Sequence, residues 1–104
     1  MSNPWAGEVT LVIDGASHVM KLTLGALAEL EAEMDADTLV AMIARFEQGH
    51  VAARDVVALI VAGLRGGGWR GSKADLLSAD IEGGPIAATR AAGELIKRAF
   101  AFDE

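Results

Sequence analysis

The sequence predicts an α+β fold that is mostly helical, in which an N-terminal β-hairpin packs on a bundle of four to five short helices. Apolar residues alternate on one side of an Asp-Gly pair near the N-terminus, and they recur at helical spacing through most of the later chain. Glycine-containing segments separate these stretches. We expect residues 1–7 to be a flexible tail and residues 8–104 to be a single domain, because 104 residues suffice for one core.

Residues 8–22 are expected to form the hairpin. Its first strand has alternating apolar residues on one face, namely Val9, Leu11 and Ile13. Asp14-Gly15 is typical of a two-residue hairpin turn. The alternation is imperfect, since Val12 and Val19 place apolar side chains on the other face. A lone hairpin is marginally stable and has two unpaired edges, so we expect the chain to self-associate through it as a homo-oligomer.

Five helices are expected to follow the hairpin. Their approximate bounds are residues 24–34, 38–48, 52–65, 73–79 and 85–102. Thr23, Asp37 and Ser72 are suited to cap the first, second and fourth helices, because each side chain can accept a hydrogen bond from a free helical N–H group. Pro85 is favourable at a first helical position.

Apolar spacing predicts how deeply each helix is buried. The second helix has the cleanest pattern, formed by Leu39, Met42, Ile43 and Phe46. The third helix is apolar almost all round, as is typical of a central helix, so we expect a charge at Val61 to unfold the domain. In the first helix the turns facing the core are marked by Leu24, Leu27 and Leu30.

Composition narrows the classes of function. The net charge of −6 disfavours nucleic acid, which is bound largely through Lys and Arg contacts to phosphate. The longest apolar run, Val56–Leu64, is less than half of the roughly 20 residues that a membrane-spanning helix needs. Cysteine is absent and the N-terminal residues lack a secretory pattern, so we expect a cytoplasmic protein. The apolar content of 52% is high for a short chain and indicates a protein-binding surface.

The segment 66–73 has the pattern of a nucleotide-binding loop but lacks the context for one. It reads Gly-Gly-Gly-Trp-Arg-Gly-Ser-Lys and satisfies GxGxxG. In a phosphate-binding loop Lys directly follows the last glycine, whereas here Ser72 does. A strand must also precede the glycines, and here a helix is predicted. We therefore expect a flexible loop between helices and no nucleotide cofactor.

Other groups that could support chemistry are isolated in the sequence. His18 and His50 have no second histidine at the spacing of metal ligands. Glu29, Glu33 and Asp37 approach one helical face, but oxygen-ligand sites usually include carbonyls from a glycine-containing loop, so a solvated acidic face fits better. We expect no enzymatic activity, no metal site and no cofactor.

Three aromatic residues are the candidate partner-binding residues. Trp69 lies within the glycine-rich loop, so it is either a plug folded back on the domain or an exposed anchor for a partner. Phe100 and Phe102 lie at the end of the chain, where helices usually fray, so they either complete the core or are covered by a partner.

Four segments together resemble a known family. They are Gly7-Glu8-Val9, Leu22–Glu31, Arg45-Phe46-Glu47 and Gly63–Gly66. The chain resembles, over roughly residues 7–100, the small phage-tail-related proteins of gene transfer agents, the phage-like particles made by alphaproteobacteria. Members are described as tail tube proteins or tail-assembly chaperones. The resemblance implies a non-enzymatic role in tail assembly, with the tape-measure protein or the tube subunit as partners.

The predicted elements favour one of these two descriptions. Tube subunits are typically rich in β-structure and build the tube wall from a sheet, whereas this chain has one short hairpin among helices. We therefore expect a cytoplasmic chaperone that holds the helical tape-measure protein soluble until the tube polymerises round it. The alternative is a structural tube component that stays in the particle.

Overall fold

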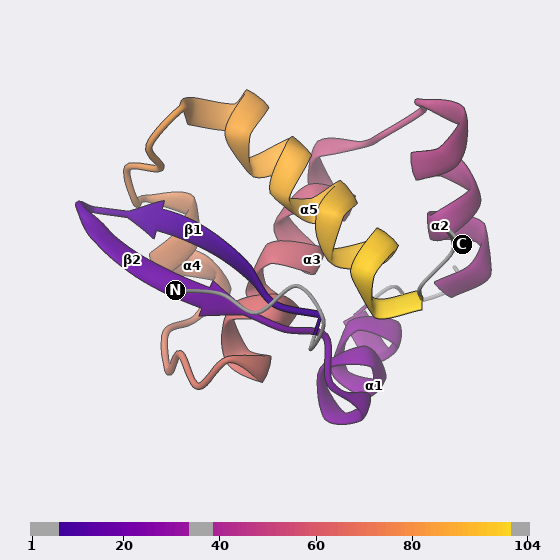
Figure 1. Cartoon of the computed structure of the whole chain (residues 1–104), viewed down its shortest axis with the longest axis horizontal. Coiled ribbons are helices and arrows are strands. Elements are labelled where there is room, and N and C mark those ends of the chain that lie inside the picture. The colour runs from indigo at the N-terminus through magenta and orange to yellow at the C-terminus, as the bar shows by residue number, and fades with distance from the viewer. Residues whose placement is uncertain (1–6, 34–38, 101–104) are drawn as a thin grey trace.

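The computed structural model describes residues 7–33 and 39–100. Its elements are β1 (Val9–Ile13), β2 (Ala16–Met20), α1 (Leu24–Glu33), α2 (Leu39–Gln48), α3 (Ala53–Gly66), α4 (Lys73–Leu77) and α5 (Gly84–Phe100). The predicted α+β class is confirmed, with a hairpin followed by helices (Figure 1). Four described bounds differ from the prediction: α3 begins at Ala53 and extends to Gly66, α4 ends at Leu77, and α5 begins at Gly84. The expected cap at Asp37 lies outside the described residues.

The hairpin forms as its sequence pattern predicts. β1 and β2 are antiparallel, in a register that runs from Val9 opposite Met20 to Ile13 opposite Ala16. Asp14 and Gly15 have φ angles of 52° and 81°, the left-handed pair that a two-residue hairpin turn requires. The alternating residues of β1 are all buried, namely Val9, Leu11 and Ile13.

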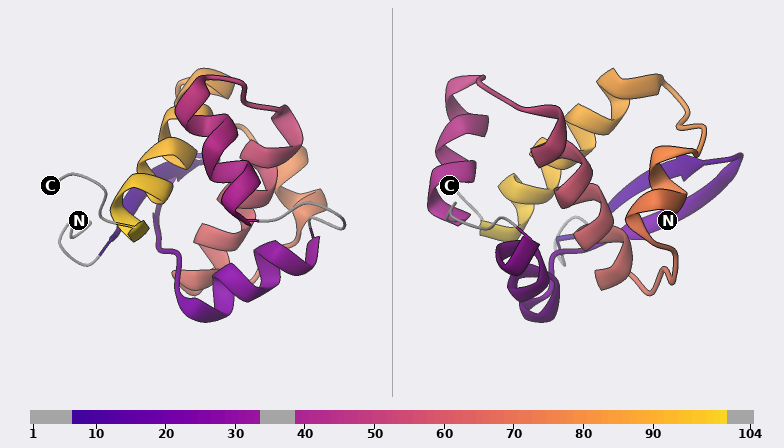
Figure 2. Two further views of the ribbon diagram at one scale, coloured as in Figure 1. Left: turned by 90° about the vertical axis from the view of Figure 1, so that its right-hand side faces the viewer. Right: turned by 180° about the vertical axis from the view of Figure 1, so that it is seen from behind.

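Helix α3 is the centre of the fold. Figure 2 shows α1 and α2 to one side of it, and the hairpin and α4 to the other. Leu59, Ile60 and Leu64 are fully buried or nearly so. Although α3 is apolar almost all round, Val57, Ala58 and Val61 are only partly buried.

The C-terminal end of α3 packs directly against the backbone of β2 and its extension. The Lys21 N–H donates to the Gly63 carbonyl at 2.9 Å. A Cβ atom at Gly66 would lie 2.0 Å from the Lys21 carbonyl oxygen, and one at Gly67 would lie 1.9 Å from that of Val19. No side chain fits into such gaps. Gly66 and Gly67, expected to belong to a flexible loop between helices, therefore also allow this close packing, and Gly66 is the last residue of α3.

A segment far along the chain covers the tip of β1. Ile81 forms an isolated bridge with Ile13. The Asp14 N–H donates to the Asp80 carbonyl at 2.7 Å, and the Glu82 N–H donates to the Val12 carbonyl at 3.0 Å. The premise that both hairpin edges are unpaired is therefore wrong at these residues. Self-association remains a prediction, but the open hairpin no longer supports it.

Two predicted caps are present, while one predicted core residue is exposed. The Thr23 hydroxyl accepts from the Ala26 N–H at 3.0 Å. Ser72 forms a capping box with Asp75 at the start of α4. Leu24, expected to face the core, is instead 86% exposed. The buried face of α1 is formed by Ala26 and Leu30, which are one turn apart.

An ion pair that the sequence pattern does not predict joins α2 to the first turn of α3. The Nε and Nη2 atoms of Arg45 donate to the two carboxylate oxygens of Asp55, each at 3.0 Å. Asp55 is only 5% exposed. Two parallel hydrogen bonds fix the relative orientation of both groups, so the pair holds α2 in position.

Candidate functional site

Trp69 is folded back on the domain. It is partly buried and packs against the core cluster, and its backbone N–H donates to the Leu64 carbonyl at 2.9 Å. The indole ring lies over Gly71, where a Cβ atom would be 2.1 Å from a ring carbon. This placement fits the plug interpretation, although part of the ring stays accessible to solvent.

The structure does not gather the predicted aromatic residues into one surface. Phe100 is half-buried against the core at the end of α5, and Phe102 lies outside the described residues. The connection between α3 and α4, which contains Trp69, lies beside β2, whereas the end of α5 lies beside α1 (Figures 1 and 2). Trp69 and Phe100 therefore belong to different regions of the molecule.

The ionisable residues are distributed rather than clustered. His18 is half-buried in β2, and His50 is exposed after α2. Glu29 pairs with Arg65 at 3.1 Å. The side chains of Glu33 and Asp37 lie outside the described part. Within residues 7–33 and 39–100, no group of three or more His, Asp or Glu residues is arranged to hold a metal ion.

None of the helices in the described ranges is both long enough and apolar enough to cross a membrane. On α3, three partly buried apolar residues border two surface grooves, namely Val57, Ala58 and Val61.

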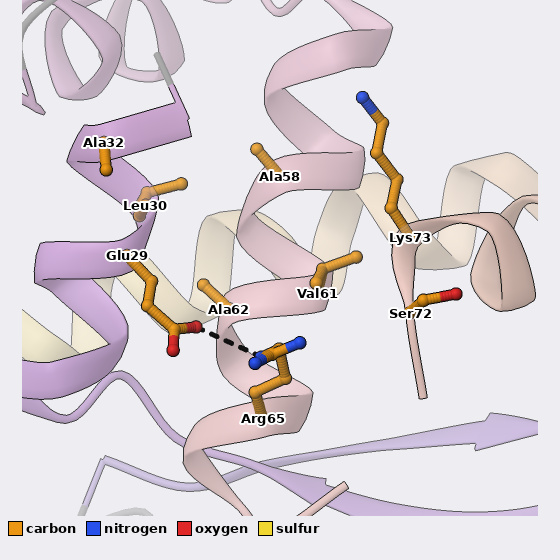
Figure 3. A pocket seen from close by; sticks show the side chains of 9 residues that line it. All are labelled: Glu29, Leu30, Ala32, Ala58, Val61, Ala62, Arg65, Ser72 and Lys73. Atoms are coloured by element: carbon orange, nitrogen blue, oxygen red, sulfur yellow. Dashed lines mark ion pairs between the residues drawn. The ribbon is translucent and has the colours of Figure 1, made fainter. Parts of the chain in front are cut away.

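The first groove, which we call the α1–α3 groove, has a cavity of about 470 Å³. Figure 3 shows its apolar floor and its polar rim. The floor is formed by Leu30, Ala58, Val61 and Ala62. The Glu29–Arg65 ion pair closes one end, while Ser72 and Lys73 stand on the opposite side (Figure 3). Lys73, which follows the glycine-rich segment, is thus a rim residue of a mixed polar and apolar groove.

The second groove, which we call the α3–α5 groove, lies between α3, α4 and the start of α5 and has a cavity of about 340 Å³. Its walls are mainly apolar and include Val57, Ile60, Leu76, Leu77, Ile81 and Ala88. Asp80 is the ionisable side chain among the described residues that line it. Such a surface can bind apolar side chains but holds no arrangement of acid, base and nucleophile for catalysis.

Sequence reasoning did not identify either groove. The sequence did contain a signal for an open apolar surface on α3. Val57 and Val61 are additional to the single apolar face that a helix needs for packing on one neighbour. Periodicity reports how many apolar residues a helix has, but it does not say which of them other helices cover.

No curated protein and no solved structure matches the chain. A family model described as "Phage tail tube protein, GTA-gp10" matches residues 6–102, which include every helix and strand described above. The four segments that resemble proteins of gene transfer agents all fall within this match. The chain therefore belongs to the GTA-gp10 phage tail tube protein family.

Proposed function

We propose that this protein is a non-enzymatic tail-assembly chaperone of a gene transfer agent, which binds the tape-measure protein or another tail protein during assembly. Membership of the family supports a tail-related role, either structural or in assembly. The chaperone role and its partners are the more specific part of the proposal.

The observation that carries the chaperone role is the covering of the hairpin edges. A tube wall made from a continuous sheet requires strand edges that can pair with the next subunit. Here the tip of β1 pairs with residues 80–82, and the C-terminal end of β2 lies against Gly66 and Gly67 of the same chain. Within the described residues, both edges are thus partly covered by the same chain, which favours an assembly factor over a wall subunit.

The test is co-expression of this protein with the tape-measure protein. If the protein is a chaperone, the tape-measure protein will stay soluble and co-purify with it. An unfolded variant, Ile60→Asp, serves as the control and should lose both effects. Equal solubility of the tape-measure protein with and without this protein, together with no co-purification, would refute the proposal.

Trp69, Phe100 and Phe102 remain candidate partner-binding residues. Trp69 and Phe100 are both only partly buried, so each leaves some surface for a contact. The double variant Trp69→Ala with Phe102→Ala should be scored for melting temperature and for co-purification with tail proteins. Lost binding at an unchanged melting temperature would support a contact role, whereas lost stability with binding retained would assign both residues to the core.

A further inference from the structure

We propose that the α3–α5 groove binds an amphipathic helix of a partner protein that carries Lys or Arg beside its apolar stripe. The inference rests on the proposed function, because a chaperone needs a surface for its client, and it names that surface and the chemistry that fits it.

Exposed apolar side chains are concentrated around this groove. Leu77 is 63% exposed on α4 and lines the cavity. Ile86 is 67% exposed on α5, between the lining residues Pro85 and Thr89. Among the described residues the other large hydrophobic side chains with comparable exposure are Leu24 and Val40, which border neither groove. Two of four such residues thus flank one cavity, as expected for a surface that a partner covers.

The layout of the apolar contacts fits a helix. The cavity is lined by Leu77 of α4 and by Pro85, Ala88 and Thr89 of α5, and the exposed Ile86 lies on α5 among these lining residues. A helix presents apolar side chains at positions i, i+3 or i+4, and i+7, which suits three successive contacts along a groove. A small apolar molecule confined to the cavity would leave Ile86, which does not line it, in water.

The charges along one side of the groove indicate the partner's polar residues. Asp80 lines the cavity, and its backbone N–H donates to the Asp14 carboxylate at 2.9 Å. Glu82 is exposed. Its backbone N–H donates to the Val12 carbonyl, which places Glu82 near the same hairpin turn. Asp80 is thus the carboxylate that lines the groove, and Asp14 and Glu82 add negative charge nearby in a chain of net charge −6. Arg54 and Arg90 come directly after groove-lining residues of α3 and α5 and carry positive charge there. Basic residues of the partner would therefore face the segment 80–82, and this preference would set the orientation of the bound helix.

The test uses two fluorescently labelled helical peptides of about 18 residues, long enough to hold helical structure. Both carry the same leucine stripe, with Lys beside it in one peptide and Glu in the other. We expect the intact protein to bind the Lys peptide about tenfold more tightly by fluorescence anisotropy, a difference of about 1.4 kcal/mol. The double variant Leu77→Asp with Ile86→Asp should weaken that binding at least about tenfold. Asp80→Lys should reverse the preference between the peptides.

Val40→Asp is the matched control. Val40 is 76% exposed on α2, so the substitution adds the same charge as each of the two groove substitutions, at a similarly exposed apolar residue outside the groove. It should leave peptide binding unchanged, and circular dichroism should show all the variants folded. Equal binding of both peptides, or equal losses in Val40→Asp and in the groove variant, would overturn the proposal.

The same variants separate this proposal from the proposed function. If the intact protein and the Leu77→Asp, Ile86→Asp variant both co-purify with tail proteins, the groove proposal fails while the chaperone function stands. If only the intact protein does so, both are supported. If neither does so, the chaperone function fails, and the peptide measurements alone decide whether the groove binds a basic amphipathic helix.

Discussion

Asp55 is a buried carboxylate whose charge is balanced by Arg45. The Asp55 side chain is 6% exposed, while that of Arg45 is 27% exposed. Arg45→Met removes the guanidinium and leaves the carboxylate buried, so we expect the free energy of unfolding in urea to fall by about 3 kcal/mol. Replacing both residues, Arg45→Met with Asp55→Leu, should recover most of that loss because no charge is then buried. A loss of less than about 0.5 kcal/mol in the single variant would contradict this role.

Two glycine substitutions should have opposite effects. A Cβ atom at Gly66 would meet the backbone oxygen of Lys21, so Gly66→Ala must push β2 away from α3 and should cost about 2 kcal/mol or more. Gly93 lies within α5 with nothing within 4 Å of its missing Cβ atom. Gly93→Ala should therefore stabilise the protein by about 0.5–1 kcal/mol through helix propensity. Thermal unfolding measures both changes, and shifts of the same sign would refute the packing account.

Individual elements were predictable where local sequence determines them. The hairpin follows from alternating residues and from the left-handed angles that Asp14-Gly15 adopts readily. Thr23 and Ser72 cap helices because their hydroxyls reach N–H groups three residues on. The rotation of α1 was not predictable, because packing against α3 selects Ala26 and Leu30 rather than Leu24 as its buried face. The partly exposed sides of α3 were not predictable either, because they depend on where α1, α4 and α5 end.

The difference between the buried and the partly exposed sides of α3 gives a prediction. Ile60 is 1% exposed, so Ile60→Asp buries a charge without a partner and should abolish cooperative unfolding. Val61 lies on the floor of the α1–α3 groove, and an aspartate there can reach water, so Val61→Asp should cost only about 1–2 kcal/mol. Lys73→Ala on the exposed rim should change stability by less than about 0.5 kcal/mol. Circular dichroism melting curves provide the comparison. Equal damage from Ile60→Asp and Val61→Asp would mean that Val61 is enclosed.

At the scale of the whole molecule, the candidate site depends on distant parts of the chain. The α3–α5 groove combines residues from α3, from α4 and its following segment, and from the start of α5. Composition predicted a surplus of apolar surface but not its position. The aromatic residues were reasonable candidates by residue type, yet Trp69 covers Gly71, and Phe100 packs against the core at the end of α5. Leu77 and Ile86, which no sequence motif marks, are the large exposed apolar residues on the two helices that border this groove with α3.

The central claim is that this member of a tail tube family assists assembly instead of forming the tube wall. Quantitative mass spectrometry of purified particles tests it directly, with the wall subunit of the tube as an internal reference for copy number. The account predicts few or no copies of this protein per particle, alongside abundant protein in the producing cells. A copy number in the particle comparable to that of the wall subunit would contradict the chaperone role and would identify the protein as a structural tail component.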